Sequence, residues 1–377
     1  LVITIVILII LATVTINAVL GENGLISKAQ QAKEIQEQAI RNEEEGMNTL
    51  LGEFAEAMGE LPVAPKLSDG MVPVKWNGSN WVKTTAEDKE WYNYGNKQWA
   101  NVVLTPTSGE KEGKDATGKA DVFNSDGTLN EDSAYSMLVW IPRYAYQITS
   151  GYHQSGADIN SADAANSAGT INVVFIDTNN QNKAKTTTYS EEYPSFATGS
   201  GMTDYVVHPA FNFGEDKLSG FWVGKYGTSH TGCTTDASTG TSNTNVTTLT
   251  PMIRAGVTSW RNIEIGNIFT VGKEINKADN PYGLSSSDSV VDPHLMKNSE
   301  WGAVAYLSKS KYGKYGKNGQ EVWVNPNSNY ITGQAGTRVN ASSTISTYSY
   351  TTSNGQEAST TGNVTGVYDM SGGAAEH

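Results

Sequence analysis

The chain has 377 residues, enough for two or three domains of ordinary size. It contains 26 Lys and Arg against 39 Asp and Glu, which gives a formal net charge of -13. This charge disfavours a general nucleic-acid binder, because such proteins need a cationic surface to displace counterions from phosphates. Its one cysteine, Cys233, excludes an intramolecular disulfide framework and metal sites built from several thiolates.

The chain starts with an apolar segment. Residues 1–20 contain no charged side chain, and a helix of that length spans about 30 Å, the thickness of a bilayer core. We expect a helix that is apolar on all sides, which requires either lipid or further copies of itself around it. A cleaved secretory peptide is disfavoured, because its apolar region is shorter and ends at a small-residue cleavage site.

The amphipathic part of this N-terminal helix (residues 1–59 as a whole) is expected over residues 25–58. Gly21 and Gly24 separate it from the apolar segment, and each glycine weakens a helix by about 1 kcal/mol relative to alanine. We therefore expect a joint at these two glycines. Apolar residues then recur at helical spacing and are predicted to pack against the following domain: Met47, Leu50, Leu51, Phe54 and Met58.

Residues 1–58 resemble a type IV pilin, especially the pilin-like proteins of Gram-positive bacteria. The phrase ILATVTINAVLGENGLISKAQQAKE carries the resemblance, which implies a helix that is stored in the membrane and then packs with other copies inside a filament. The family usually has a Glu near the mature N-terminus, but the first acidic residue here is Glu22. An ordinary single-span anchor remains the alternative. The residues predicted to pack in the filament core are Leu1, Ile5, Leu8, Leu11, Val14, Ile16 and Leu20.

Residues 60–134 are predicted to form a small Trp-rich β region followed by a polar loop. The run VKWNGSNWV places Asn77 and Gly78 between apolar and aromatic residues, which is a strong β-hairpin signal. Four tryptophans occur in this region, and we assign them to core positions rather than to a carbohydrate-binding platform. They are Trp76, Trp81, Trp91 and Trp99.

Residues 135–377 are predicted to form a further domain. Strand-like runs occur at residues 136–148, 170–176 and 219–226, and a helix is expected over residues 294–313, capped by Asn298 or Ser299. Taken with the first 59 residues, this pattern predicts an α+β fold class, in which a long N-terminal α-helix precedes a β-rich body.

This third region resembles the formylglycine-generating-enzyme type of C-type-lectin-like fold. The phrases SGFWVGKYGTS, MKNSEWGAVAYLSKS and GVYDMSGGAAEH carry the resemblance. That fold normally continues beyond the last phrase, so we expect the domain to be truncated at its C-terminus. Five residues match the closing motif of the family, and Gly373 replaces its Asn. The matching residues are Tyr368, Asp369, Met370, Gly372 and Glu376.

The residues that this family uses for catalysis are missing. Its oxidase chemistry needs two thiols where this chain has only Cys233, and the histidines do not show metal-ligand spacing. We therefore expect no enzyme, no catalytic, cofactor-binding or metal-binding residues, and no cofactor. Calcium is doubtful, because Gly373 replaces an Asn that helps to bind it in the family. The histidines are His153, His208, His230, His294 and His377.

The leading hypothesis is a structural subunit of an extracellular type IV pilus-like filament that displays its β-rich body for adhesion. The partners expected are copies of itself, the membrane before assembly, the pilus assembly machinery, and a surface glycan or protein as ligand. The alternative is a membrane-anchored adhesin that does not polymerise. A metal-dependent oxidase is the weakest hypothesis, because its ligands are missing from the sequence.

Overall fold

The computed structural model describes residues 33, 36, 62–148, 171–182, 187–192, 202–235, 243–288, 291–314, 321–326, 330–336 and 347–374. The chain divides into two units, Leu1–Met58 and Gly59–His377. All of the described residues except 33 and 36 belong to the second unit. We call this second unit the body.

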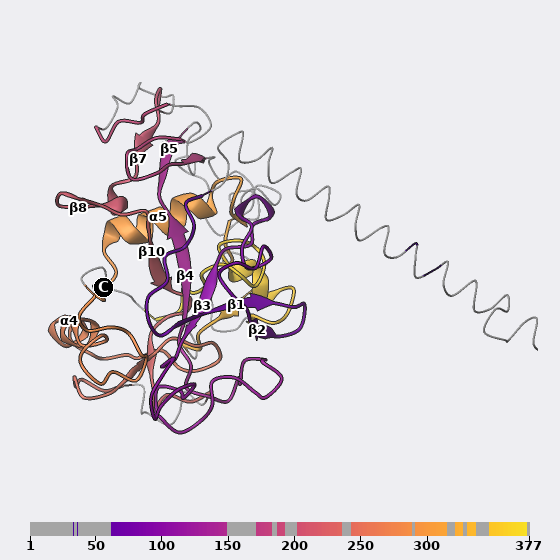
Figure 1. The fold of residues 1–377 in the computed structure, drawn as a ribbon, viewed down its shortest axis with the longest axis vertical. Coiled ribbons are helices and arrows are strands. Elements are labelled where there is room, and N and C mark those ends of the chain that lie inside the picture. Colours follow the sequence, from indigo (N-terminus) through magenta and orange to yellow (C-terminus); the bar gives the residue numbers. More distant parts are fainter. Residues whose placement is uncertain are drawn as a thin grey trace, which may run out of the picture. The chain divides into compact units, whose positions relative to one another are not determined.

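A five-stranded antiparallel sheet forms the centre of the body (Figure 1). Its strand order is β10-β4-β3-β1-β2, so strands from both sides of residue 135 share one sheet. The β1–β2 hairpin confirms the prediction from Asn77-Gly78, with Trp76 directly opposite Trp81 and Gly78 at a φ of 100°. The strands are β1 (Met71–Trp76), β2 (Trp81–Lys83), β3 (Asn101–Leu104), β4 (Met137–Pro142) and β10 (Gly220–Gly224).

A single residue, Arg143, carries the chain from the first sheet into a second. Beyond it, β5 (Tyr144–Ile148) is the central strand of a three-stranded antiparallel sheet, between β6 (Ile171–Phe175) and β7 (Val206–Val207). Arg143 is fully buried at this junction. Its guanidinium donates to the carbonyls of Phe211 and Leu218 and to the side-chain oxygens of Asn180 and Asn212.

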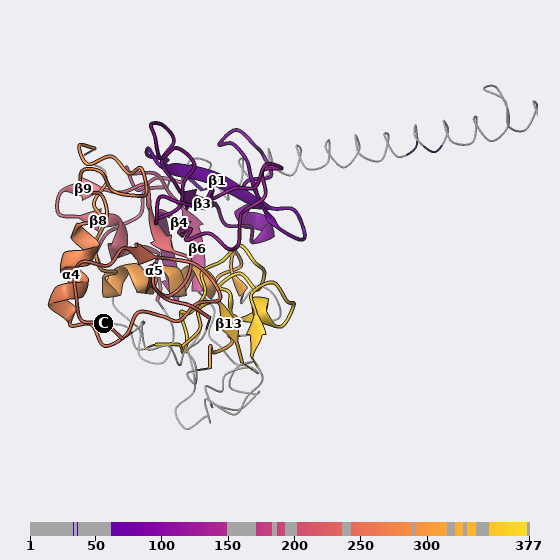
Figure 2. The same cartoon turned by 90° about the horizontal axis from the view of Figure 1, so that it is seen from below.

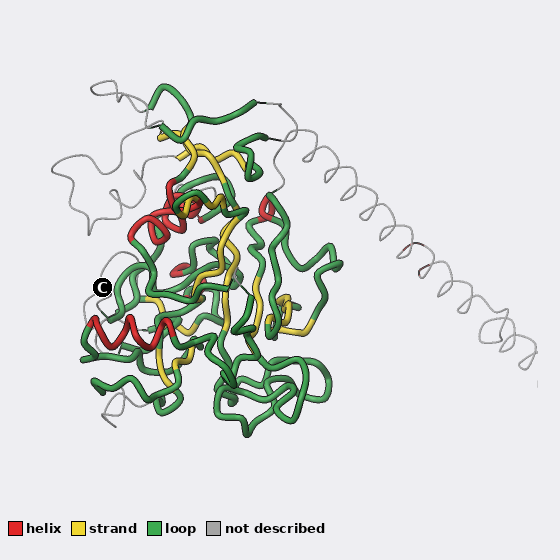
Figure 3. Tube along the Cα trace, turned by 60° about the vertical axis from the view of Figure 1, so that its left-hand side comes forward, coloured by secondary structure: helices red, strands yellow, loops and turns green. Residues whose placement is uncertain are grey.

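Much of the body consists of loops and short elements (Figure 3). This follows from its many Gly, Asn, Ser and Thr residues, which favour turns over long regular elements. The short elements are η1 (Tyr94–Asn96), η2 (Pro209–Phe211), β8 (Asn212–Phe213), β9 (Asp216–Lys217), β11 (Ser229–His230), β12 (Pro251–Met252), β13 (Gln334–Ala335), β14 (Tyr348–Ser349) and η5 (Gly355–Ala358).

The described residues contain two α-helices of appreciable length, α4 (Ile265–Lys273) and α5 (Asn298–Ser308). Helix α5 lies within the predicted range of residues 294–313, but its N-cap is Lys297 rather than Asn298 or Ser299. The Glu300 carboxylate accepts a hydrogen bond from the backbone N–H of Lys297 at 2.8 Å, which lets the helix start one residue earlier. Helix α4 was not predicted.

Two main hydrophobic clusters stabilise the body. The larger one joins the five-stranded sheet, the three-stranded sheet and α5, whose Ala303, Val304 and Leu307 are fully buried. The second cluster lies around the β1–β2 hairpin and brings Trp81 together with Tyr368 from the C-terminal part of the chain. Figure 2 shows α5 alongside the strands and the C-terminal segment with β13 next to them. All the residues of these two clusters lie at or after Met71 in the sequence.

The predicted fold class is wrong. The described residues are β-rich with only two short α-helices, and no long N-terminal helix is part of the described structure. The two helices that are described, α4 and α5, have 9 and 11 residues, and the Gly-, Asn-, Ser- and Thr-rich sequence of the body favours turns over longer helices. Among the described residues, no helix has the length and hydropathy needed to cross a membrane.

Candidate functional site

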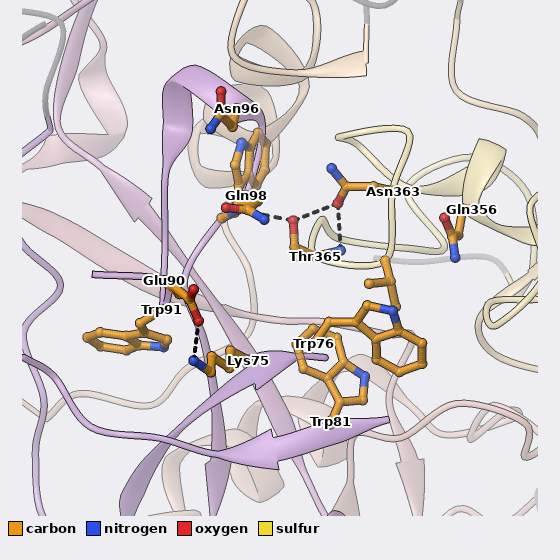
Figure 4. A pocket seen from close by; sticks show the side chains of 12 residues that line it. Lys75, Trp76, Trp81, Glu90, Trp91, Asn96, Gln98, Gln356, Asn363 and Thr365 are labelled. Carbon is orange, nitrogen blue, oxygen red and sulfur yellow. Dashed lines mark hydrogen bonds and ion pairs between the residues drawn. The ribbon is translucent and has the colours of Figure 1, made fainter. Parts of the chain in front are cut away.

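A pocket of about 200 Å³ opens where the β1–β2 region meets the C-terminal part of the chain. Figure 4 shows that the side chains lining the pocket extend from two segments that are far apart in sequence. Residues 75–99 supply one wall and residues 356–365 supply the other. The lining residues are Lys75, Trp76, Trp81, Glu90, Trp91, Asn96, Gln98, Trp99, Gln356, Asn363, Val364 and Thr365.

Four indole rings form much of the first wall. Trp81, Trp91 and Trp99 are buried, as predicted for core positions, but Trp76 is only half-buried at the end of β1. Trp76 meets Trp81 edge-on, with ring centroids 5.5 Å apart, because the two residues are cross-strand partners. The wall therefore combines a rigid packed base with one aromatic ring that remains partly accessible.

The indole N–H groups of this wall differ in their hydrogen bonding. Trp91 donates to the carbonyl of Asn101 at 2.8 Å, and Trp99 donates to the carbonyl of Tyr312 at 2.9 Å. The N–H of Trp81 is buried and has no acceptor within the described part of the chain. A buried donor without an acceptor costs about 1–3 kcal/mol.

Thr365 connects the two walls. Its hydroxyl accepts from the backbone N–H of Trp99 at 3.1 Å and lies 2.7 Å from the Asn363 side-chain oxygen. The Asn363 amide donates to the carbonyl of Lys97 at 2.9 Å, and the Asn101 amide donates to the carbonyl of Thr365 at 2.8 Å. These bonds span up to 266 residues of sequence and fix the spacing of the two walls.

Behind the pocket, the buried ammonium of Lys225 holds the second wall in place. It donates to the carbonyls of Val364 and Gly366 at 2.7 and 2.8 Å and lies 4.8 Å from the Trp81 ring centroid. Burial lowers the pKa of Lys225 well below its ordinary value. Gly366 has no room for a side chain, since a Cβ would lie 2.4 Å from the Ser359 hydroxyl.

The charges at the rim are already paired. The Lys75 ammonium lies 2.9 Å from Asp88 and also bonds Glu90. Hydrogen bonds from Lys75 and then from Thr84 lower the pKa of Asp88 to about 2, so this carboxylate stays ionised at neutral pH. One cation and two carboxylates leave the rim with a net charge of about -1. Because Lys75, Asp88 and Glu90 are paired with one another, none of these three charges at the rim is available to an anionic or a cationic ligand.

Three side-chain amides of the lining are free of internal hydrogen bonds. Asn96 and Gln98 are exposed and Gln356 is half-buried, and none of their side-chain amides has a partner among the described residues. Asn363, by contrast, uses both its oxygen and its nitrogen within the protein. Each free amide can donate and accept at once. The pocket thus offers an aromatic ring and several neutral polar groups for which the fold itself has no use.

The residues expected to assemble a filament lie outside the described residues. This applies to the predicted filament-core residues, to the joint at Gly21 and Gly24, and to the predicted body-packing residues, which include Met47 and Phe54. His153, Glu376 and His377 also lie outside the described residues.

The remaining histidines take part in structural contacts. His208 is buried among the rings of Tyr144, Tyr146 and Tyr306, and burial lowers its pKa to about 3. The side chain of His230 accepts from the backbone N–H of Gly232 at 3.0 Å. In the described ranges, no three His, Cys, Asp or Glu side chains gather as a metal-binding set.

Of the described residues of the closing motif, Tyr368 and Asp369 are buried, Met370 is half-buried and Gly372 is exposed. The Asp369 carboxylate accepts from the Asn325 amide at 2.7 Å and from the backbone N–H groups of Gly227 and Gly333. Asp369 therefore holds three segments together.

Sequence reasoning missed the pocket. A wall rich in Trp with Asn and Gln between the rings could have been recognised around Asn96 and Gln98. No local signal, however, connects that wall with Gln356. No protein-family model, curated protein or solved structure matches this chain.

Proposed function

We propose that this protein is a subunit of an extracellular type IV pilus-like filament. The apolar segments of neighbouring copies pack together in the filament, and the β-rich body is displayed outside for adhesion. One observation carries the proposal: the uncharged run of residues 1–20 belongs to a different unit of the chain from the body, which has hydrophobic clusters of its own.

The apolar segment needs an environment that shields it from water. Twenty uncharged, mostly aliphatic residues release roughly 25 cal/mol for each Å² of apolar surface removed from water, so exposure to solvent is strongly unfavourable. Lipid and other copies of the same segment are the two environments that cover it on all sides. In a membrane-held precursor the segment is covered by lipid, and in the polymer built from it the segment is covered by other copies of itself.

The body supplies the outer surface in this proposal. Its pocket presents side-chain amides that form no hydrogen bond with the described residues, and such groups are available for recognition of a ligand. The chain's net charge of -13 would keep a densely packed fibre soluble.

Electron microscopy of material sheared from producing cells, with mass spectrometry of the fibres, tests the proposal. Uniform thin fibres composed of this chain are expected. Leu8→Glu and Leu11→Glu should each abolish fibres, since a carboxylate would be buried without a partner. Leu67→Glu is the matched control, because Leu67 is an exposed leucine of the body, and it should leave fibre yield unchanged.

The alternative is a membrane-anchored adhesin that does not polymerise. It has the same body and pocket but predicts no fibres, with the chain recovered only from membranes. Under this alternative, Leu8→Glu would reduce membrane retention alone. Fibres that persist in both the Leu8→Glu and Leu11→Glu variants would contradict the packing proposed for the apolar segment.

A further inference from the structure

We propose that the pocket between residues 75–99 and 356–365 binds a neutral saccharide, one sugar ring at a time. This inference deepens the adhesion part of the proposed function and rests on the body being displayed outside the cell. The size, charge and hydrogen-bonding capacity of the pocket support it.

The size of the pocket limits the ligand to one ring. Its volume of about 200 Å³ lies below the roughly 300–1,000 Å³ of pockets that enclose drug-sized ligands. A nucleotide or a folded peptide segment is too large to be enclosed, whereas a single six-membered ring or a terminal residue of a chain fits.

The charge of the pocket favours a neutral ligand. A phosphate or carboxylate would approach Glu90, and Lys75, the one cation among the described lining residues, is already shared between Asp88 and Glu90. A cationic ligand could meet the Trp76 ring but would also meet the Lys75 ammonium. Charged ligands of both signs are therefore disfavoured.

The polar groups match hydroxyls in particular. A hydroxyl donates one hydrogen bond and accepts others, and so does the side-chain amide of Asn96, Gln98 or Gln356, none of which has a partner among the described residues. Backbone groups of a peptide would use amides too, but a peptide would not fill a ring-sized space beside an indole.

The aromatic group supplies the other half of the recognition. One face of a pyranose consists of C–H groups with partial positive charge, and the face of an indole ring is negative. Trp76 is half-buried and braced edge-on by both Trp81 and Tyr350, so its orientation is fixed before a ligand arrives. Preorganised groups bind more tightly because less freedom is lost on association.

The test measures binding of methyl glycosides of glucose, galactose, mannose, N-acetylglucosamine and N-acetylgalactosamine to the full chain. Saturation-transfer NMR and tryptophan fluorescence report binding, with inorganic phosphate and tetramethylammonium as charged probes. A polyoxyethylene detergent keeps the chain in solution, because a glycoside detergent would itself present a sugar. At least one glycoside should bind in the millimolar range, which is usual for so small a polar ligand.

The variants assign the binding to this pocket. Gln98→Ala and Gln356→Ala should each weaken binding roughly three- to tenfold, the range for one lost hydrogen bond. Trp76→Ala should abolish binding, and Trp76→Phe should retain part of it. Trp301→Ala is the matched control, because Trp301 is a partly exposed tryptophan of α5 that does not line the pocket, and it should leave binding unchanged.

Three results would overturn the inference: no glycoside binds, a charged probe binds in place of the sugars, or the two Gln variants bind as tightly as the unmodified chain. The experiment uses dispersed chains, so it does not depend on fibre formation. Fibres without sugar binding would contradict this inference alone, and sugar binding without fibres would contradict the filament alone.

Discussion

Two sets of side-chain amides in the body differ in their hydrogen bonding: one set bonds within the fold and the other does not. Around Arg143, the oxygens of Asn180 and Asn212 both accept from the buried guanidinium, and the Asn180 nitrogen donates to Glu191 at 2.6 Å. At the pocket, the amides of Gln98 and Gln356 have no partner in the described body. The same chemical group thus serves the fold in one region and remains available to a ligand in the other. Hydrogen-bond satisfaction, rather than residue type, distinguishes a structural polar cluster from a candidate binding surface.

Breaking the Arg143 cluster should have the largest effect. Arg143→Met removes a charge donor to four oxygens and leaves buried acceptors without partners, so the free energy of unfolding should fall by about 3–5 kcal/mol. Urea denaturation of the full chain measures this. Arg143→Lys should lower the free energy of unfolding by a smaller amount. It should not reach the stability of the unmodified chain, since an ammonium cannot reproduce the planar hydrogen-bonding geometry of a guanidinium. An Arg143→Met variant as stable as the unmodified chain would show that the cluster is not structural.

The same region contains a buried titratable group that lowers stability in acid. The folded protein protonates His208 only near pH 3, whereas the unfolded chain protonates it near pH 6.5. Between these values the unfolded state binds more protons, so stability rises with pH and falls on acidification. The loss should be about 2–3 kcal/mol between pH 6.5 and 4.5. Denaturation midpoints across this pH range provide the measurement.

Two variants separate this effect from other titrations. His208→Asn keeps a side chain that can cap η2 but removes the imidazole, so the pH dependence should flatten. His294 titrates in the opposite sense, because the hydrogen bond to Glu300 raises its pKa, and its stabilisation is lost as pH rises. His294→Gln should therefore steepen the fall in acid. An unchanged slope in His208→Asn would show that His208 does not cause it.

Changing the free amides should have the smallest effect on stability. Gln98→Ala and Gln356→Ala remove no internal hydrogen bond, so each should change the free energy of unfolding by less than about 0.5 kcal/mol. Thermal denaturation of both variants beside Arg143→Met provides the test. A loss above about 1 kcal/mol would mean that these amides support the fold, and the contrast between the two regions would disappear.

Local patterns predicted two local structures of the body, a hairpin and a helix. Asn77-Gly78 between alternating apolar residues was enough for the β1–β2 hairpin, and the apolar face over residues 294–313 was enough to place α5. Helix α4 could not be predicted, because Gly266 and Gly272 lie within it. Val271 is the buried residue of this helix, and Gly272 lies so close to the following segment that a Cβ would be 3.3 Å from the backbone nitrogen of Leu295.

The fold class and the site depended on relations that no local pattern contains. The α+β prediction gave weight to a long apolar and amphipathic N-terminal pattern, whereas the described body is built from short strands and loops. In the same way, Trp76 could be placed in a hairpin but not beside Gln356. That proximity depends on Thr365 reaching Trp99 across 266 residues of sequence.

The distance in sequence between the two pocket walls has a consequence during synthesis. Chains emerge from the ribosome N-terminus first, and their early parts begin to fold before the rest exists. The hairpin with Trp76 can therefore form while residues 356–365 are still to be translated, and Lys225 then has no Val364 or Gly366 carbonyl to bond. In the proposed mode of binding, the saccharide is bound only after the late segment has docked, so a nascent or prematurely terminated chain cannot compete with finished molecules for the same ligand.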